Sequence, residues 1–224
     1  LVSRMRPKHL AIELSKLQPH PCGFVELEQY ATEGDLAAYW MLGVDQLDDV
    51  EGKHVVDLAA GNGILGLATL MIGAGHVTLV EGDKAAAEAA LANIERVTQR
   101  RDGTASVVHA MVGHEEIEIE RPVDLVVMNP PWGVQTARAD RPLLELAFSL
   151  GAPAVHILHS AKARHVQAIA RDNGYEGEIM LETEFRLPRT YAHHTKGKAA
   201  TEVRCWRFHL PGDAKLIEDE IEEA

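Results

Sequence analysis

The sequence predicts an α/β fold built around one mostly parallel sheet. From Lys53 onward, β-branched apolar runs alternate with alanine-rich stretches of helical periodicity, which is the pattern of repeated strand–helix–strand units. Two longer apolar runs near the carboxyl end are separated by a polar loop, which is typical of an antiparallel hairpin. A length of 224 residues suits one α/β domain with a full core, and a second independent domain would be cramped.

The first part of the chain is expected to be helical. Residues 6–17 place apolar side chains among charges and end before Pro19 and Pro21, so a short helix is predicted there. A second helix is predicted over residues 34–42, after the polar segment 27–32.

The alternating part of the chain then supplies the sheet and its covering helices. Parallel strands are predicted over residues 54–58, 76–81, 104–110, 123–128 and 154–159. Helices are predicted between them over 64–72, 84–99 and 141–150, and after the last strand over 161–172. The antiparallel pair is predicted over 178–187 and 201–210. The acidic tail, residues 213–224, is expected to be a solvated end helix, with a docking element as the alternative.

Charge and composition limit the partners and the compartment. The formal net charge of -12 repels nucleic acid at long range, so an RNA substrate would need local positive charge or a partner that supplies it. The same acidity suggests a salt-adapted source. Cys22 and Cys205 are too few for a disulfide scaffold or a zinc site of the chain's own, which fits a cytoplasmic protein. No apolar run approaches the roughly 18 residues that span a bilayer, so no membrane role is expected.

The residues Asn129-Pro130-Pro131-Trp132 directly follow the apolar run 123–128. A planar exocyclic or amide NH2 is a poor nucleophile, because its lone pair is delocalised into a neighbouring π system. The Asn129 side-chain oxygen and the Pro130 carbonyl can accept its two N–H groups, and Trp132 offers a flat face to a base or amide. The prolines fix the backbone and remove competing donors. The motif favours a site that holds a planar NH2 for methylation over a simple proline turn.

A glycine-rich loop follows the first strand. Residues 57–63, Asp-Leu-Ala-Ala-Gly-Asn-Gly, close that strand and open a helix, where an open α/β sheet binds its nucleotide. Gly61, Gly63 and Gly66 also match the dinucleotide spacing G-x-G-x-x-G, which is weak evidence by itself. Glu81 ends the second strand, where a carboxylate can accept both hydroxyls of an adenosine ribose. NAD enzymes and S-adenosylmethionine enzymes share this arrangement.

Two features favour S-adenosylmethionine over NAD. Asp57 suits the ammonium group of the methionine part, whereas it would repel a pyrophosphate. The tetrapeptide at Asn129 has no role in hydride transfer. The alternative for Asp57 is a residue that only hydrogen-bonds loop amides.

Together these residues resemble the class I, seven-strand, Rossmann-like methyltransferase superfamily. The closer resemblance is to the methyltransferase-like-five family of archaea and eukaryotes, which makes N6-methyladenosine in small-subunit ribosomal RNA. Residues 27–32, Leu-Glu-Gln-Tyr-Ala-Thr, are similar to the family's Leu-Glu-Gln-Tyr-Pro-Thr segment. The glycine loop, Glu81 and the tetrapeptide with Gly133 follow, and 187–191, Leu-Pro-Arg-Thr-Tyr, resemble Leu-Pro-x-Ser-Tyr. The resemblance covers about residues 6–210.

The resemblance implies a division of the chain and a set of site residues. An N-terminal helical extension, residues 1–45, would cover the donor site, followed by the methyltransferase domain, 46–211, and the acidic tail, 212–224. Catalytic roles are implied for Asn129, Pro130, Pro131 and Trp132. Contacts with S-adenosyl-L-methionine are expected from Gln29, Tyr30, Thr32, Asp57, Ala59, Gly61, Asn62, Gly63, Ile64, Glu81 and Met111. The family's Asp for the donor adenine is replaced here by the region Ala-Met-Val at 110–112, so packing and backbone amides are expected to recognise the adenine.

Two further contacts are predicted with macromolecules. A basic loop carries Arg189, Lys196 and Lys198, which are predicted to contact RNA phosphates, with an ordinary basic hairpin loop as the alternative. Residues 104–110 would lie at the sheet edge if the strand order follows the superfamily. The resemblance implies a heterodimer at that edge with a small zinc-binding methyltransferase activator protein. No metal site is predicted in the chain itself, and His156 and His159 are expected to be structural.

The residues and the resemblance together predict an S-adenosylmethionine-dependent N6-adenine methyltransferase that acts on RNA, in particular on small-subunit ribosomal RNA. A protein glutamine N5-methyltransferase that acts on a translation release factor is the enzymatic alternative, because a glutamine amide presents the same two N–H groups. A catalytically silent scaffold that binds a partner through its sheet edge is the alternative from a different class.

Overall fold

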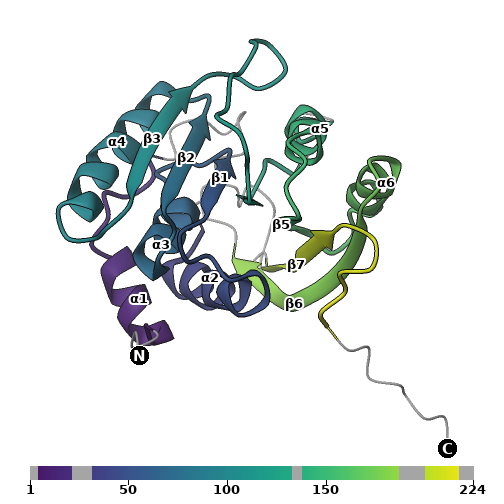
Figure 1. Cartoon of the computed structure of the whole chain (residues 1–224), viewed down its shortest axis with the longest axis horizontal. Helices are drawn as coiled ribbons and strands as arrows, with labels where there is room; N and C mark the ends of the chain where they lie inside the picture. The colour runs from purple at the N-terminus through teal and green to yellow at the C-terminus, as the bar shows by residue number, and fades with distance from the viewer. Residues whose placement is uncertain (1–4, 22–31, 133–137, 187–199, 217–224) are drawn as a thin grey trace, which may run out of the picture.

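The computed structural model, which describes residues 5–21, 32–132, 138–186 and 200–216, is an α/β structure with helices on both faces of one sheet (Figure 1). In the described residues the sheet has seven strands in the order β3-β2-β1-β4-β5-β7-β6. The strands are β1 His54–Leu58, β2 His76–Glu81, β3 Thr104–His109, β4 Leu125–Met128, β5 Ala154–Ser160, β6 Glu176–Arg186 and β7 Ala200–His209. The first five are parallel, and β7 runs antiparallel to both β5 and β6. The predicted fold class is confirmed.

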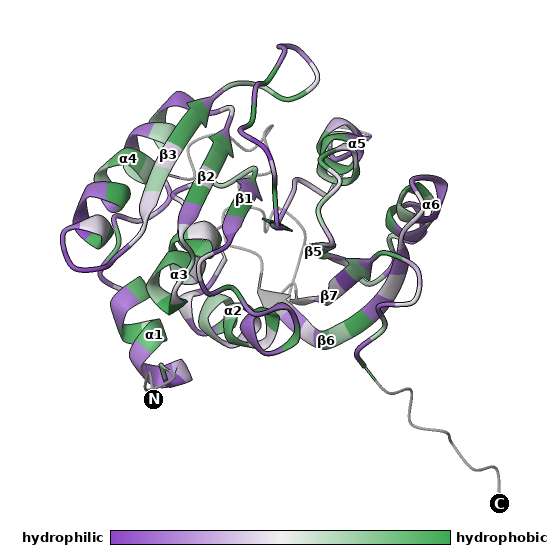
Figure 2. Ribbon diagram, in the orientation of Figure 1, coloured by the Kyte–Doolittle hydropathy of each residue, from purple (hydrophilic) through white to green (hydrophobic). Residues whose placement is uncertain are grey.

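Two layers of helices enclose the sheet (Figure 1). The helices are α1 Pro7–Leu14, α2 Gly34–Asp48, α3 Ile64–Ile72, α4 Lys84–Thr98, α5 Arg141–Ser149 and α6 Arg164–Asp172. Helices α1 to α4 bury their apolar side chains in one core cluster, while α5 and α6 bury theirs in a second cluster on the opposite face. Figure 2 shows that these helices carry hydrophilic as well as hydrophobic positions, as expected for helices with one face in the core and one in solvent.

Helix α2 is longer than predicted, because Gly43 does not end it. The helix continues to Asp48, and Gly43 faces the side chain of Met180. A Cβ at this position would lie 3.4 Å from the Met180 methyl carbon, so the glycine lets β6 approach the helix closely. Glycine often ends a helix, but Gly43 lies inside α2 and allows close packing.

Helices α4 and α5 each end one residue earlier than predicted, and α1 and α6 are shorter by several residues. The Ser15 hydroxyl donates to the carbonyl of Ile12, and the chain then tightens into a turn, so α1 ends at Leu14. Helix α6 begins at Arg164 because Ala161 N–H still donates to the Glu202 carbonyl of β7. The end of α1 and the start of α6 are each set by a local hydrogen bond, and the spacing of apolar residues does not predict such bonds.

The start of the acidic tail is not helical, which corrects the prediction for its described part. Residues 213–216 lie against the body of the protein. The Lys215 ammonium donates to the Leu47 carbonyl and to Asp48, and its backbone N–H donates to Glu178. Residues 217–224 lie outside the described residues.

The topology places five strand ends at one edge of the sheet. Because β3, β2, β1, β4 and β5 are parallel neighbours in that order, their carboxyl ends lie side by side. This edge is where open α/β sheets bind ligands. None of the described helices is long and apolar enough to cross a membrane.

Candidate active site

The predicted site residues that the structure describes gather at the carboxyl ends of the parallel strands. The glycine loop follows β1, Glu81 ends β2, Met111 follows β3 and Asn129 follows β4. Gln29, Tyr30, Arg189, Lys196 and Lys198 lie outside the described residues.

Asn129 is held by two hydrogen bonds that fix the direction of its amide. Its Nδ2 donates to the Thr32 Oγ1 at 3.0 Å, and its Oδ1 accepts from the Trp132 Nε1–H at 3.3 Å. An indole N–H can only donate, so the atom that faces Trp132 must be the oxygen. Oδ1 has a second lone pair that a ligand N–H can use. The structure thus brings Thr32, Asn129 and Trp132 together from segments far apart in the sequence.

Trp132 is 7% exposed and packs with the first core cluster. Its indole ring lies against the imidazole of His159, with 6.2 Å between the ring centroids and 35° between the planes. Pro130 is also buried, and Pro131 is partly buried. A base can stack on the indole only if the segments that cover it move aside.

The glycine loop adopts backbone conformations that suit close approach of a ligand. Ala59, Gly61 and Gly63 have φ angles of 55°, 57° and 85°. A left-handed alanine is uncommon, so its presence here marks a loop whose geometry is fixed by its surroundings. Gly63 is the N-cap residue of α3 and has no side chain to cap it, and the Asp57 carboxylate accepts the Gly66 N–H of the first turn instead.

Asp57 is a buried carboxylate with one acceptor atom unused. Oδ2 accepts the Gly66 N–H at 2.8 Å, whereas Oδ1 has no hydrogen-bond partner among the described residues. Burial raises the pKa of Asp57 to about 8, and the nearby Glu81 carboxylate acts in the same direction. A buried acceptor of this kind is satisfied by a cation or an N–H donor.

Glu81 links the second strand to the loop. Its two carboxylate oxygens accept the Gly61 N–H and the Asp83 N–H, each at 2.7 Å. Burial raises the pKa of Glu81, although these backbone hydrogen bonds lower it in part. Each carboxylate oxygen can still accept a further hydrogen bond, so a diol can be bound in this position.

The remaining predicted donor contacts surround these two carboxylates. The Met111 side chain lies against Gly82, where an added Cβ would stand 2.8 Å from the methionine methyl carbon. Asn62 donates its Nδ2 to the Gln18 carbonyl, and Asn93 donates to the Asn62 carbonyl. Ile64 is the first residue of α3. Met111 therefore offers an apolar surface next to Glu81, while Asn62 fastens the N-terminal segment to the loop.

The sequence interpretation missed His20, which lies over the glycine loop. A Cβ on Gly61 would stand 2.6 Å from the His20 ring, so only glycine fits beneath it. Burial lowers the pKa of His20. Its position between Pro19 and Pro21 gave no signal of this contact.

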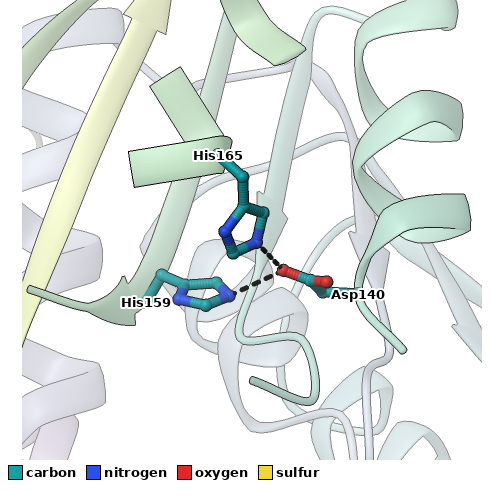
Figure 3. Close-up of side chains that lie close together, drawn as sticks. All are labelled: Asp140, His159 and His165. Carbon is teal, nitrogen blue, oxygen red and sulfur yellow. Dashed lines mark hydrogen bonds and ion pairs between the residues drawn. The ribbon is translucent and has the colours of Figure 1, made fainter. Parts of the chain in front are cut away.

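A second group of residues was also missed. Asp140, His159 and His165 meet beside Trp132, with both imidazoles directed at one carboxylate oxygen (Figure 3). They come from the N-terminus of α5, the end of β5 and the start of α6. The pKa of Asp140 is lowered overall, because hydrogen bonds from the two histidines outweigh the effect of burial. No spacing in the sequence connects them, since only the fold brings the three segments together.

Comparisons with known proteins agree with this geometry. Residues 35–175 match the family model of the Methyltransferase small domain. The chain is 32% identical to the rRNA N(6)-adenosine-methyltransferase Mettl5 of Drosophila melanogaster, over 82% of this chain and 87% of that protein. It is 29% identical to the METTL5 protein of Danio rerio of the same description, over 81% of this chain and 88% of that one.

A solved structure is similar over nearly the whole chain. A Pyrococcus horikoshii protein, described as a candidate RNA methyltransferase, is 34% identical and superposes with a TM-score of 0.78, over 93% of this chain and 99% of that one. With its seven-stranded sheet, its glycine loop and these relatives, the chain belongs to the methyltransferase small domain family and is an S-adenosylmethionine-dependent methyltransferase.

Proposed function

We propose that this chain methylates the N6 amino group of an adenine in RNA, in particular in small-subunit ribosomal RNA. The observation that carries the proposal is the Asn129 amide, fixed by Thr32 and Trp132 at the end of β4 and beside the glycine loop. Relatives that align over most of the chain are named as rRNA N6-adenosine methyltransferases, which supports RNA as the substrate.

The described residues fit S-adenosylmethionine. The unpartnered Asp57 Oδ1 suits the ammonium group, Glu81 suits the ribose hydroxyls, and the backbone around Gly61 and Gly63 allows close approach. Met111 would pack against the adenine, with Ala59, Asn62 and Ile64 completing the wall. When bound, the donor supplies a methyl group already activated by the positive sulfur.

The residues after β4 hold the acceptor amine. The free lone pair of Asn129 Oδ1 and the Pro130 carbonyl accept the two N–H groups, which draws electron density back onto the nitrogen. Pro131 fixes the backbone between them and adds no donor. Thr32 keeps the amide from turning its NH2 toward the substrate. Positioning supplies most of the rate, and the amine can lose its proton after methyl transfer, so no strong base is needed.

The extension and the basic loop extend this site. Residues 1–45 cover the donor, with Gln29, Tyr30 and Thr32 in contact with it. Arg189, Lys196 and Lys198 contact RNA phosphates, which offsets the repulsion from a net charge of -12. The target adenine is unpaired or turned out of its stack, so that its edge reaches Asn129 and its face meets Trp132.

The partner is proposed to bind at strand β3. This strand has only β2 as a neighbour among the described strands, and its side chains are exposed or half-buried. A small zinc-binding activator protein would add a strand there and form a heterodimer.

A transfer assay tests the proposal. The protein, with and without the activator, is incubated with methyl-labelled donor and either deproteinised small-subunit rRNA or a translation release factor, and N6-methyladenosine is quantified in the digested RNA. Label in the RNA as N6-methyladenosine, absent with Asn129→Ala, is expected. Label in the release factor instead would refute the proposal. The release factor serves as the control substrate because the relatives do not favour glutamine methylation.

A further inference from the structure

We propose that Asp140, His159 and His165 form a hydrogen-bonded unit that positions Trp132 in the acceptor pocket, with Asp140 and His159 as positioning residues. The inference rests on the proposed function of the tetrapeptide at Asn129, because Trp132 belongs to it.

The unit is compact and its inner members are buried. His159 Nε2 lies 2.9 Å and His165 Nε2 lies 2.5 Å from the same oxygen, Asp140 Oδ2 (Figure 3). Asp140 and His159 are each 1% exposed, whereas the His165 side chain is 47% exposed. The unit therefore reaches from the surface to the buried indole of Trp132.

Asp140 occupies a position where aspartate normally caps a helix. It is the N-cap residue of α5, yet its side chain makes no capping hydrogen bond. An aspartate that caps a helix normally accepts a backbone N–H of the first turn and stabilises the helix. The carboxylate instead accepts hydrogen bonds from His159 of β5 and His165 of α6, so this aspartate connects three elements and does not cap its own helix.

The hydrogen bonds define the state of His159. Its Nδ1 accepts the Ser160 backbone N–H at 2.9 Å, so the ring proton lies on Nε2 and is donated to Asp140. The imidazole is thus fixed at both nitrogens. A ring fixed in this way can hold its neighbour in one orientation.

That neighbour is Trp132. The His159 ring lies 6.2 Å from the indole, and the indole Nε1–H donates to Asn129 Oδ1. The contacts run from His165 through Asp140 and His159 to Trp132, and from there to the amide that receives the substrate. If the indole tilts, the Asn129 hydrogen bond changes with it.

A metal ion is the competing occupant of these side chains. The three ligand atoms lie within 4.8 Å of one another, which is close enough for a shared ion. A histidine bound to metal through Nε2 carries its proton on Nδ1 and donates it to a nearby acceptor. Nδ1 of His159 faces a backbone N–H donor instead, which disfavours a metal at Nε2.

Strand β5 offers a matched control. His156 lies on the same strand, is fully buried, and contacts the Asp48 carboxylate at 2.7 Å, on the other side of the sheet from Asp140. Replacing either histidine removes one buried hydrogen bond between an imidazole and an aspartate carboxylate. The difference between His159→Ala and His156→Ala therefore isolates the contact with Trp132.

The first experiment observes Trp132 without any need for activity. The chain has three tryptophans, so a protein labelled with 15N at the indoles gives three resonances in an NMR correlation spectrum, and Trp132→Phe assigns one of them. Asp140→Ala and His159→Ala are expected to shift or broaden the Trp132 resonance. Asp140→Asn is expected to restore it, because an amide oxygen can accept from both histidines. A Trp132 resonance as unchanged in His159→Ala as in His156→Ala would overturn the proposal.

The second experiment measures methyl transfer. Asp140→Ala and His159→Ala are expected to lower kcat about ten-fold or more, because small misplacements at an acceptor site have large effects on rate. Donor affinity should stay within about three-fold, and Asp140→Asn should keep most of the rate. Stoichiometric binding of Co²⁺ to the wild type, lost in Asp140→Asn, would show a metal site and refute the hydrogen-bonded unit.

The two experiments separate this inference from the proposed function. If the wild type does not methylate RNA, the function fails, yet the indole resonance still reports whether Asp140 and His159 position Trp132. If RNA is methylated and Trp132 does not respond, only the positioning role fails.

Discussion

Asn129 can present its oxygen to an amine only while its amide is kept from rotating. Thr32 Oγ1 accepts from Nδ2 at 3.0 Å and supplies half of that constraint. Thr32→Val keeps the shape and removes the acceptor, so we expect kcat to fall about ten-fold. Thr32→Ser keeps the hydroxyl and is the matched control. Single-turnover methyl transfer measures both, and equal rates for the two variants would contradict the role of Thr32.

Asp57 is expected to make the stability of the unliganded protein depend on pH. Its pKa is raised from 3.8 to about 8 by burial, so the folded state binds a proton that the unfolded state releases. Stability from this group is fully present below pH 3.8 and is lost as the pH rises to about 8. Asp57→Asn stays neutral, so it should gain stability relative to the wild type between pH 5 and 8.5.

Urea unfolding at the two pH values measures this difference, and calorimetric titration measures donor binding. Asp57→Asn should bind S-adenosylmethionine much more weakly, because the ammonium group loses its anion. If the gap in unfolding free energy between variant and wild type is the same at both pH values, Asp57 does not carry the proton.

At the scale of single residues, the sequence predicted the site residues that belong to contiguous motifs. Asn129, Trp132, Asp57 and Glu81 follow strands whose ends the fold brings together, so their neighbourhood could be inferred from the strand pattern. The hydrogen bond between Asn129 and Thr32 joins residues 97 positions apart, and neither the motifs nor the resemblance predicted it.

Asp140, His159 and His165 could not be found in this way. Each is unremarkable in its own segment, and a histidine at the end of a strand reads as structural. The two histidines of β5 differ only in the side of the sheet that they face, which depends on what packs there.

At the scale of elements, the strands were predictable because they are buried runs between turn residues. The bounds of α3 and β2 agree with the prediction, whereas the length of α2 does not. Gly43 packs against Met180 of β6 and does not form a turn, and the sequence alone does not distinguish a packing glycine from a turn glycine. Helix ends are set by single hydrogen bonds, so they carry the largest errors.

Strand β3 carries the prediction about the partner. The N–H groups of Thr104 and Ala110 donate to the chain at β2, so by strand alternation the N–H groups of Ala105, Val107 and His109 point outward. Ala105→Pro removes an outward donor and leaves the pairing with β2. It should bind the activator at least ten-fold more weakly while the thermal unfolding of the isolated chain changes little.

Ser106→Pro is the contrasting variant, because it removes a donor that faces β2 and should destabilise the chain itself. Binding is measured by calorimetry with the purified activator. Unaltered affinity in Ala105→Pro would exclude pairing along this edge.

At the scale of the whole molecule, one buried arginine ties the carboxyl end to the body. Arg207 on β7 is fully buried and makes a bidentate contact with Asp48 of α2, with further hydrogen bonds to Glu178 and Asp213. Although burial acts to raise it, the pKa of Asp48 is lowered overall by hydrogen bonds from His156 and Arg207.

Removing Arg207 leaves the buried carboxylates around it without a compensating positive charge. Arg207→Met should lower the free energy of unfolding by about 3–5 kcal/mol. Arg204 lies on the same strand and pairs with Glu182 at the surface, so Arg204→Met should cost less than about 1 kcal/mol. Urea unfolding compares them, and equal losses would mean that the buried group is no more important than a surface pair.

The net charge of -12 leads to a prediction about salt. Like charges spread over a folded surface repel one another, and the Debye length falls from about 10 Å at 0.1 M salt to about 3 Å at 1 M. The group around Arg207 is buried and is screened far less, so added salt should relieve repulsion without losing this attraction. The midpoint of thermal unfolding should therefore rise between 0.05 and 1 M KCl, and the loss caused by Arg207→Met should stay nearly constant. A midpoint of thermal unfolding that is flat or falls with KCl would count against salt adaptation. If the destabilisation caused by Arg207→Met disappears at high salt, the Arg207 contacts are exposed to solvent.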